Sequence, residues 1–276
     1  MTLGLVAGAC VPPAAGAAAQ AASTPPIAFR YTTDQLVCAA FHETSHGTLD
    51  TQTGGRQRHE TLRRDGVLQL RARPGGPAIT IEAWYDSLTL SRRSADGTLA
   101  PDTDGLLGGR YRGTLSPDGR YAATARPFVP DEVAEVADVG GALDDLLPPI
   151  PPAALAVGER WSDGAGLELE RLPDSLAGRR VVQRLVLRSR SESDRATIRG
   201  DTAAISARQV TVEQGRVDWD PRVGFLRRIR HVVVETSVPA GGPVAQPVRT
   251  RLEQEVYLVR RRATGCVREA EAPHEP

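Results

Sequence analysis

The chain of 276 residues contains no lysine: its 34 basic residues are all arginine, and 34 acidic residues bring the formal net charge to zero. Without lysine it cannot carry the G-x-x-x-x-G-K loop that cradles nucleotide phosphates. A balanced charge also argues against a general nucleic-acid-binding protein, because such proteins need a basic excess to displace counterions. Composition therefore points away from nucleotide and nucleic-acid partners.

Aromatic residues and long apolar runs are also scarce. Aromatics make up 4% of the chain, whereas the 40% hydrophobic and 25% charged fractions are ordinary for a folded globular protein. No uncharged apolar stretch reaches the roughly 18 to 20 residues that a membrane-spanning helix requires. The G-x-S-x-G motif of α/β-hydrolases is absent. The length fits two domains of ordinary size or one large β-domain.

Charge is missing altogether from the beginning of the chain, where no charged residue precedes Arg30. The small and apolar residues 5–9 before Cys10 resemble the lipobox of bacterial lipoproteins, whose cysteine carries the lipid. An A-x-A pattern at residues 19–21 is suited to ordinary signal peptidase instead. We expect residues 1–25 to be a lipoprotein-type export segment or a plain signal peptide. The protein would then be periplasmic, anchored to the outer membrane through Cys10, or secreted.

Only three cysteines are present, and two of them flank the main body of the sequence. Cys38 lies near its start and Cys266 near its end. This placement suits a disulfide that ties the first and last strands together in an oxidising compartment, although two unrelated thiols would fit the sequence as well. None of the cysteines shows metal-type spacing such as C-x-x-C.

A period of two dominates the body of the sequence. Apolar residues alternate with charged ones from Val248 to Leu258, and the same pattern recurs at residues 79–85. Such alternation is typical of strands with one face on a core and the other in water. Asp-Gly pairs between these runs are turn signals. The prediction is a mainly β (α+β) protein, built as a large antiparallel twisted sheet or a half-open β-barrel.

One segment in the middle has a helical period. Apolar residues recur at helical spacing from Asp131 to Leu147, with a Gly pair at residues 140–141 and a proline-rich exit after it. We expect a helix, or two short helical pieces, and a proline-rich connection over residues 131–153. This segment would join two pseudo-repeated halves of a single β-rich domain at residues 26–268, with residues 269–276 as a disordered tail.

Three short motifs between residues 109 and 161 carry a family resemblance: SPDG at residues 116–119, PIPP at 149–152 and VGERW at 157–161. They resemble elements of uncharacterised bacterial exported proteins with "SPDG", "LP-x-x-P" and "VG-[DE]-x-W" patterns. Those proteins are similar in layout to envelope carriers of the LolA and lipoprotein type. The resemblance implies a half-open β-barrel with a helix across its mouth and no established activity. The low aromatic content departs from the aromatic-rich cavity of such carriers.

The sequence HETSH at residues 42–46 matches the zinc-peptidase motif H-E-x-x-H. On a helix, His42 and His46 would share a face and chelate one zinc ion, and Glu43 would activate the bound water. On a strand, the two histidines would stand about 13 Å apart at 3.3 Å per residue and could not share an ion. The sequence alone leaves the conformation of residues 36–47 open, so a secreted zinc metallopeptidase is the alternative to a non-enzymatic protein.

Two further groups of residues suggest a ligand or a partner. Trp84, Trp161 and Trp219 are candidates for lining a cavity, although tryptophan more often anchors a core. Arginine clusters at residues 63–64, 179–180, 227–230 and 260–262 could dock anionic lipid headgroups, or they could be solvated basic positions.

Together these features predict an exported cell-envelope protein without enzymatic activity. Its concave sheet would bind a lipid or another apolar ligand, or an envelope protein partner, without a cofactor. Contact with the membrane would be made only through a lipid anchor.

Overall fold

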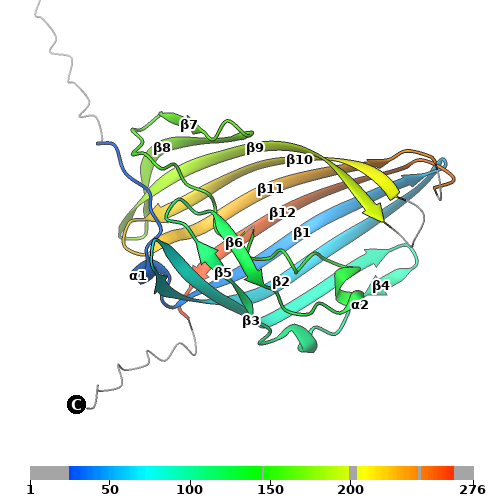
Figure 1. The fold of residues 1–276 in the computed structure, drawn as a ribbon, viewed down its shortest axis with the longest axis horizontal. Coiled ribbons are helices and arrows are strands. Elements are labelled where there is room, and N and C mark those ends of the chain that lie inside the picture. Colours follow the sequence, from blue (N-terminus) through cyan, green and yellow to red (C-terminus); the bar gives the residue numbers. More distant parts are fainter. Residues whose placement is uncertain (1–24, 145, 199–203, 242–243, 264–276) are drawn as a thin grey trace, which may run out of the picture.

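The computed structural model describes residues 25–144, 146–198, 204–241 and 244–263. These residues form one antiparallel sheet of 12 strands that curls around the chain's own connecting segments (Figure 1). The prediction of a mainly β protein with a large antiparallel sheet is confirmed. No helix in the described part of the chain has the length and hydropathy to span a bilayer.

The order of the strands across the sheet is β6-β5-β3-β2-β1-β12-β11-β10-β9-β8-β7, and β4 pairs with β3 alone. The strands are β1 (Ala39–Thr53), β2 (Arg56–Gly75), β3 (Ala78–Ser94), β4 (Gly97–Leu99), β5 (Tyr111–Leu115), β6 (Tyr121–Ala125), β7 (Arg160–Ser162), β8 (Leu167–Ala177), β9 (Arg180–Ile198), β10 (Ala204–Asp220), β11 (Gly224–Val238) and β12 (Val248–Arg261). The helices are short: α1 (Thr33–Leu36), the 3-10 turn η1 (Asp104–Leu106) and α2 (Asp131–Ala134).

This order places the first and last strands side by side in the middle of the sheet. Ala40 of β1 pairs with Arg261 of β12, and the register continues to Thr53 opposite Val248. We call the end of the sheet where β1 begins and β12 ends the proximal end, and the opposite end the distal end. The edges of the sheet are β6 and β7, which adjoin the segment linking the two halves of the chain. The two strands that border the open side of the sheet therefore come from the middle of the sequence.

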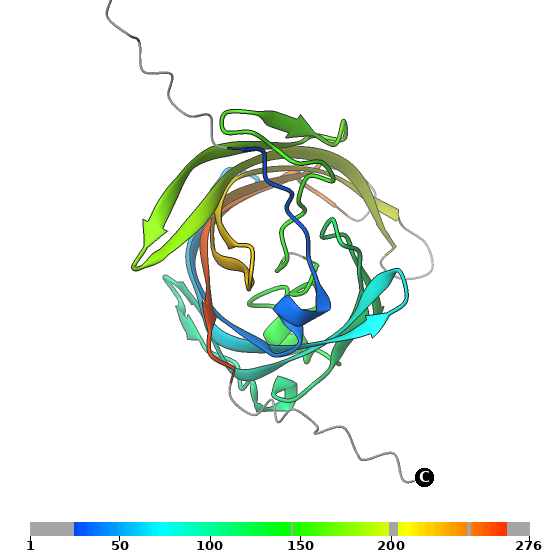
Figure 2. The same ribbon diagram turned by 90° about the vertical axis from the view of Figure 1, so that its left-hand side faces the viewer.

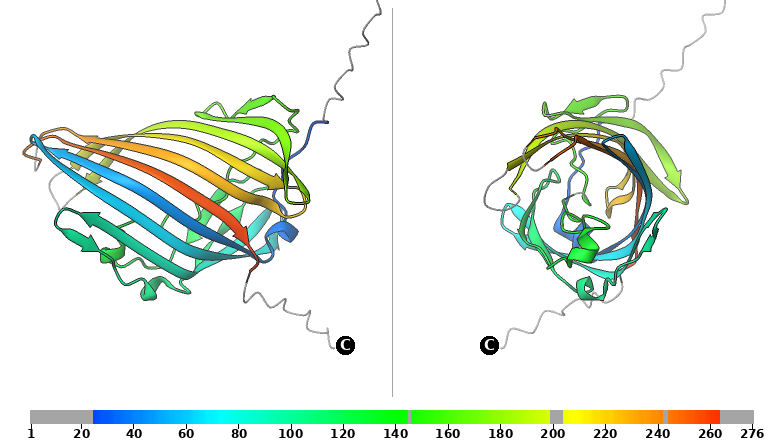
Figure 3. Two further views of the ribbon diagram at one scale, coloured as in Figure 1. Left: turned by 180° about the vertical axis from the view of Figure 1, so that it is seen from behind. Right: turned by 90° about the vertical axis from the view of Figure 1, so that its right-hand side faces the viewer.

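Alternation decides which side chains face the inside of the curl. Ile79, Ile81, Ala83 and Tyr85 of β3 are all buried, as the pattern of residues 79–85 predicts. The charged residues between the apolar positions of β12 are mostly exposed on the outer face, which Figure 3 shows from behind. The two-residue period of the sequence thus gives the correct inner face.

The proximal half of the inner face is filled by a core rich in aromatic rings. Phe41 of β1 stacks on Phe225 of β11, with ring centroids 4.6 Å apart. Trp219 of β10 is 1% exposed and meets the edges of Phe29 and Tyr31, which belong to the segment before β1. This segment crosses the proximal opening, shown in blue in Figure 2. The few aromatics of the chain are thus concentrated at one end.

The SPDG turn joins β5 to β6 and is held by the proline-rich segment. The amide of Gly119 donates to the carbonyl of Ser116, and the amide of Ile150 donates to the carbonyl of Asp118. Gly119 has a φ of +87°, and a β-carbon there would lie 2.6 Å from the carbonyl oxygen of Pro148. Glycine is required here both by the backbone conformation and by the close approach.

The segment between β6 and β7 is less helical than its sequence pattern suggests. Among the described residues of this segment only α2 is helical, and turns follow it through the Gly pair at residues 140–141. The apolar residues of the pattern are nevertheless buried against the sheet: Val133, Val136, Val139, Leu143, Leu146 and Leu147. The prediction of a helix over most of residues 131–147 is wrong, because tertiary burial rather than helical hydrogen bonding fixes this segment. Of the two short helical pieces given as the alternative, the described residues contain one, α2.

Arg171 of β8 fastens the N-terminal segment to the sheet. Its side chain is fully buried, and it donates hydrogen bonds to the carbonyls of Pro25 (2.9 Å) and Leu155 (2.8 Å). It also bonds Asp174 at 3.1 Å. The predicted domain limits at residues 25 and 268 fall at or beyond the borders of the described residues, and both they and the pseudo-repeat remain predictions.

Candidate functional site

A cavity of about 640 Å³ lies on the inner face of the sheet, between the middle of the strands and the segment after α2. Its floor is formed by β1, β2, β9, β10, β11 and β12. We call residues 136–144 together with Leu146, which cover it, the roof. The floor and the roof contribute Glu43, Ser45, Leu62, Arg63, Arg64, Val136, Ala137, Asp138, Gly141, Ala142, Asp144, Leu146, Ser189, Ser191, Gln209, Thr211, Glu213, Arg230, Val232, Val234, Leu252, Gln254, Val256 and Leu258.

An apolar strip runs along the middle of the floor. Val232 and Val234 of β11 lie beside Leu252 of β12, because Val234 pairs with Leu252 in the register of the two strands. These three side chains are half-buried, in contrast to Val256 and Leu258, which are buried nearer the proximal core. Beyond the roof, the strip therefore retains apolar surface that the described residues do not cover.

A first group of charged residues borders the strip on the β1–β2 side. Arg64 and Glu43 form an ion pair of 2.8 Å, and their side chains are only 11% and 13% exposed. Tyr85 of β3 receives a hydrogen bond from Arg64 and donates one to Glu43. Burial opposes the charged form of Arg64, but Tyr85 and Glu43 outweigh this effect and raise its pKa. Burial also raises the pKa of the Tyr85 hydroxyl, so it remains a proton donor.

A second charged group borders the strip on the β10–β11 side. Glu213 accepts hydrogen bonds from Arg228 at 2.8 Å and from Arg230 at 2.9 Å. Burial alone would raise the pKa of Glu213, but the two guanidinium groups and their hydrogen bonds outweigh burial and lower it. Arg228 also reaches the carbonyl of Leu146 in the roof, at 3.4 Å. This group therefore connects the floor to the roof.

The polar residues between the two charged groups are neutral. Gln254 of β12 donates a hydrogen bond of 2.9 Å to the hydroxyl of Ser45, which is 1% exposed. Ser189, Ser191 and Thr211 lie on the far side of the second charged group. The floor thus combines an apolar strip with hydroxyl, amide and guanidinium donors. A site of this composition and volume can hold one ligand with an apolar part and a polar end.

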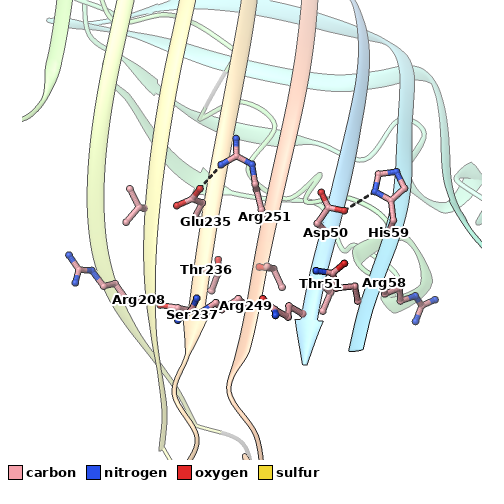
Figure 4. A pocket seen from close by; sticks show the side chains of 14 residues that line it. Asp50, Thr51, Arg58, His59, Arg208, Glu235, Thr236, Ser237, Arg249 and Arg251 are labelled. Atoms are coloured by element: carbon pink, nitrogen blue, oxygen red, sulfur yellow. Dashed lines mark hydrogen bonds and ion pairs between the residues drawn. The ribbon is translucent and has the colours of Figure 1, made fainter. Parts of the chain in front are cut away.

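A second depression, of about 700 Å³, lies on the outer face near the distal end (Figure 4). Its side chains are largely exposed and pair with one another: His59 bonds Asp50 at 2.7 Å, and Arg251 bonds Glu235. Exposed ion pairs of this kind are weak and are compatible with a solvated surface. We regard the inner cavity as the candidate site, because only it combines burial with an apolar strip.

The HETSH motif lies on strand β1, and this geometry overturns the zinc-peptidase alternative. His42 and His46 point to the outer face, where His42 bonds Asp65 at 3.1 Å. Glu43 points to the opposite face and pairs with Arg64. Residues four apart on a strand stand about 13 Å apart, too far to share a zinc ion. The described residues also contain no cluster of potential metal ligands.

The three tryptophans lie outside the cavity. Trp219 belongs to the proximal core, and Trp161 of β7 packs partly against the same core. Trp84 is half-buried on the outer face under the guanidinium of Arg110, 3.9 Å from its ring centroid. None of the three is among the residues that line the floor or the roof.

The predicted roles of the cysteines are not tested by the structure. Cys38 directly precedes β1, and β12 ends at Arg261 beside the start of β1, an arrangement that a disulfide between the first and last strands would need. Cys266 and Cys10 lie outside the described residues. The Cys38–Cys266 disulfide and the lipidation of Cys10 therefore remain predictions.

Sequence reasoning missed the buried charges of the floor. The arginine cluster at residues 227–230 is interpreted above as a headgroup-binding or solvated group, but Arg228 and Arg230 are only 4% and 7% exposed. The signal was present: both share the parity of Val232 and Val234, the apolar inner positions of the same strand. A charged residue on the apolar side of a strand indicates a buried partner, in this case Glu213.

Comparisons with known proteins give no family. No family model matches the chain, and no curated protein matches it. Among solved structures, the chain is similar to lipovitellin, from a study entitled "Lipid-protein interactions in lipovitellin", with 11% sequence identity and a TM-score of 0.44. The match covers 85% of this chain and 26% of the lipovitellin chain, so this chain spans about a quarter of that protein. Similarity at this level does not establish a relationship.

Proposed function

We propose that this chain is a non-enzymatic binding protein of the cell envelope that holds an amphipathic ligand, such as a fatty acid or a lipid, in the inner cavity. The observation that supports this function is the apolar strip of Val232, Val234 and Leu252, which lies on a concave face and is left uncovered beyond the roof. Apolar surface in this position is stabilised by contact with a ligand.

The charged groups beside the strip give the ligand an orientation. Arg230 and Arg64 both line the cavity, and both lie level with Val256, at the proximal end of the strip. An apolar chain on the strip would place its polar end within reach of one of these guanidinium groups, which bind carboxylates and phosphates in a forked geometry. Each guanidinium already has a carboxylate partner, Glu43 or Glu213. The polar end therefore adds to an existing network rather than neutralising a free charge.

The chain provides a matched pair of variants to test this function. Val234 faces the cavity, and its neighbour Val233 faces outward on the same strand. We expect Val234→Asp to weaken binding of a fluorescent fatty acid at least tenfold, because the new carboxylate would lose its hydration against the ligand's apolar part. Val233→Asp should bind the probe like the unsubstituted protein.

Titration of the fluorescent fatty acid into the purified full-length protein, with circular dichroism to verify folding, measures both affinities. Equal affinities for the two variants, or no binding by the unsubstituted protein, would rule the proposed function out.

A further inference from the structure

The turn between β8 and β9 projects from the rim of the proximal end, as the end-on view of Figure 2 shows, and it carries exposed apolar residues. Leu176 and Val181 are neighbours across this turn and are 74% and 55% exposed. Elsewhere on these two strands, inward-facing Leu169 and Leu185 are buried. An adjacent pair of exposed aliphatic residues at a projecting tip is a feature of surfaces that contact a partner or a membrane.

Arginines surround this apolar tip. Arg179 and Arg180 form part of the turn and are exposed. Arg222 is exposed in the turn between β10 and β11, at the same end of the sheet. Asp220, the last residue of β10, lies 3.9 Å from Arg180 and offsets only part of the charge. The tip and the adjacent turn therefore present aliphatic and cationic groups together.

The first and last described residues of the chain also lie at the proximal end of the sheet. Pro25 is held by Arg171 of β8, the strand that leads into the tip, and β12 ends at the proximal end (Figure 1). Pro25, the first described residue after the predicted export segment that contains Cys10, therefore lies on the side of the molecule that carries the tip. An attached lipid would bring the tip towards the bilayer.

We propose that the proximal end docks on an anionic bilayer surface. Leu176 and Val181 enter the boundary between headgroups and acyl chains, and Arg179, Arg180 and Arg222 bind lipid phosphates. The charge of the surface and the aliphatic pair favour a bilayer over a protein partner, because each arginine near an anionic membrane contributes attraction independently of shape complementarity. This docking does not depend on the function proposed for the cavity.

Sedimentation with lipid vesicles tests the proposal. The full-length chain with Cys10→Ser, which cannot be lipidated, should bind phosphatidylcholine vesicles that contain phosphatidylglycerol and should bind pure phosphatidylcholine vesicles far less. Adding Arg179→Gln and Arg180→Gln should lower the affinity about 30-fold, at about 1 kcal/mol per arginine. Leu176→Ser with Val181→Ser should lower it about tenfold.

Two exposed arginines at the distal end provide the control. Arg56→Gln with Arg249→Gln removes the same charge from the opposite end of the sheet and should change the affinity less than twofold. Equal losses for the proximal and distal pairs, unaltered binding by both tip variants, or no binding to anionic vesicles would each overturn the proposal. The tip variants should still bind the fatty acid as the parent does, and Val234→Asp should still bind vesicles, so failure of one proposal is distinct from failure of the other.

Discussion

The proximal and distal halves of the inner face are formed by the same strands but differ in how completely their apolar side chains are buried. In the proximal half, Phe41 and Phe225 are covered by the chain's own N-terminal and proline-rich segments. Farther along the same strands, Leu49 of β1 and Val234 of β11 remain half-exposed. The described connecting segments therefore bury the apolar side chains of the proximal half more completely than those of the distal half.

The largest effect is expected at the proximal closure of the sheet. If Cys38 and Cys266 form a disulfide, Cys266→Ser should lower the unfolding free energy of the oxidised protein by about 4 to 5 kcal/mol, because the bond closes a very long loop. Denaturant unfolding with and without a reducing agent measures this loss, and mass spectrometry of unreduced peptides identifies the bond. Identical stability of the two proteins without reducing agent would exclude the disulfide.

A nearly equal loss is expected in the proximal core. Trp219→Ala should cost about 4 kcal/mol, because the indole is fully buried between Phe29 and Tyr31 and its removal leaves a cavity. Affinity for the fatty acid should remain unchanged under conditions in which the variant is folded. A loss below about 1 kcal/mol would show that the proximal core is not the main source of stability.

The charged floor between the two halves should make stability depend on pH. We expect Glu213→Gln to cost about 3 kcal/mol at pH 7, because it leaves Arg228 and Arg230 buried without their carboxylate. The pKa of Glu213 is lowered in the folded state from an ordinary value of 4.5. Its contribution is therefore complete above pH 4.5 and is lost as the pH falls through the folded pKa.

The difference in unfolding free energy between the unsubstituted protein and Glu213→Gln should consequently shrink at acidic pH. Urea unfolding at neutral pH and at a pH well below 4.5 measures the two differences. A difference that is the same at both values would show that Glu213 does not carry its charge in the folded protein.

The smallest effect on stability is expected in the distal half. Leu252→Ala should cost about 1 kcal/mol, because the side chain is only half-buried. It should nevertheless weaken fatty-acid binding several-fold, because Leu252 belongs to the apolar strip. Thermal unfolding and probe titration of the same preparation separate the two effects. A large loss of stability with unchanged binding would reverse the roles assigned to the two halves.

The sequence predicted the architecture better than the site, for physical reasons. Alternation along β3 and β12 reveals the inner face, because burial of one side of a strand constrains every second residue. The pairing of β1 with β12 depends on contacts between distant parts of the chain, which periodicity does not encode. In the sequence, only the positions of Cys38 and Cys266 indicated that the first and last strands lie side by side.

The floor was harder to predict because its polar residues interact across strands. Arg230 and Glu213 are 17 positions apart and meet only when β10 and β11 pair. The HETSH motif shows the converse: its spacing suits zinc on a helix, but on β1 the histidines and Glu43 face opposite sides. A local motif is therefore informative only once the backbone conformation around it is known.

Photo-crosslinking tests the central claim most directly. A fatty acid with a diazirine near the end of its chain, bound to the purified protein and irradiated, should label the cavity side of β11 and β12, at Val232, Val234 and Leu252. Adducts confined to the outer face, at Val233, Glu235 or Arg251, would contradict the account and place the ligand on the wrong side of the sheet.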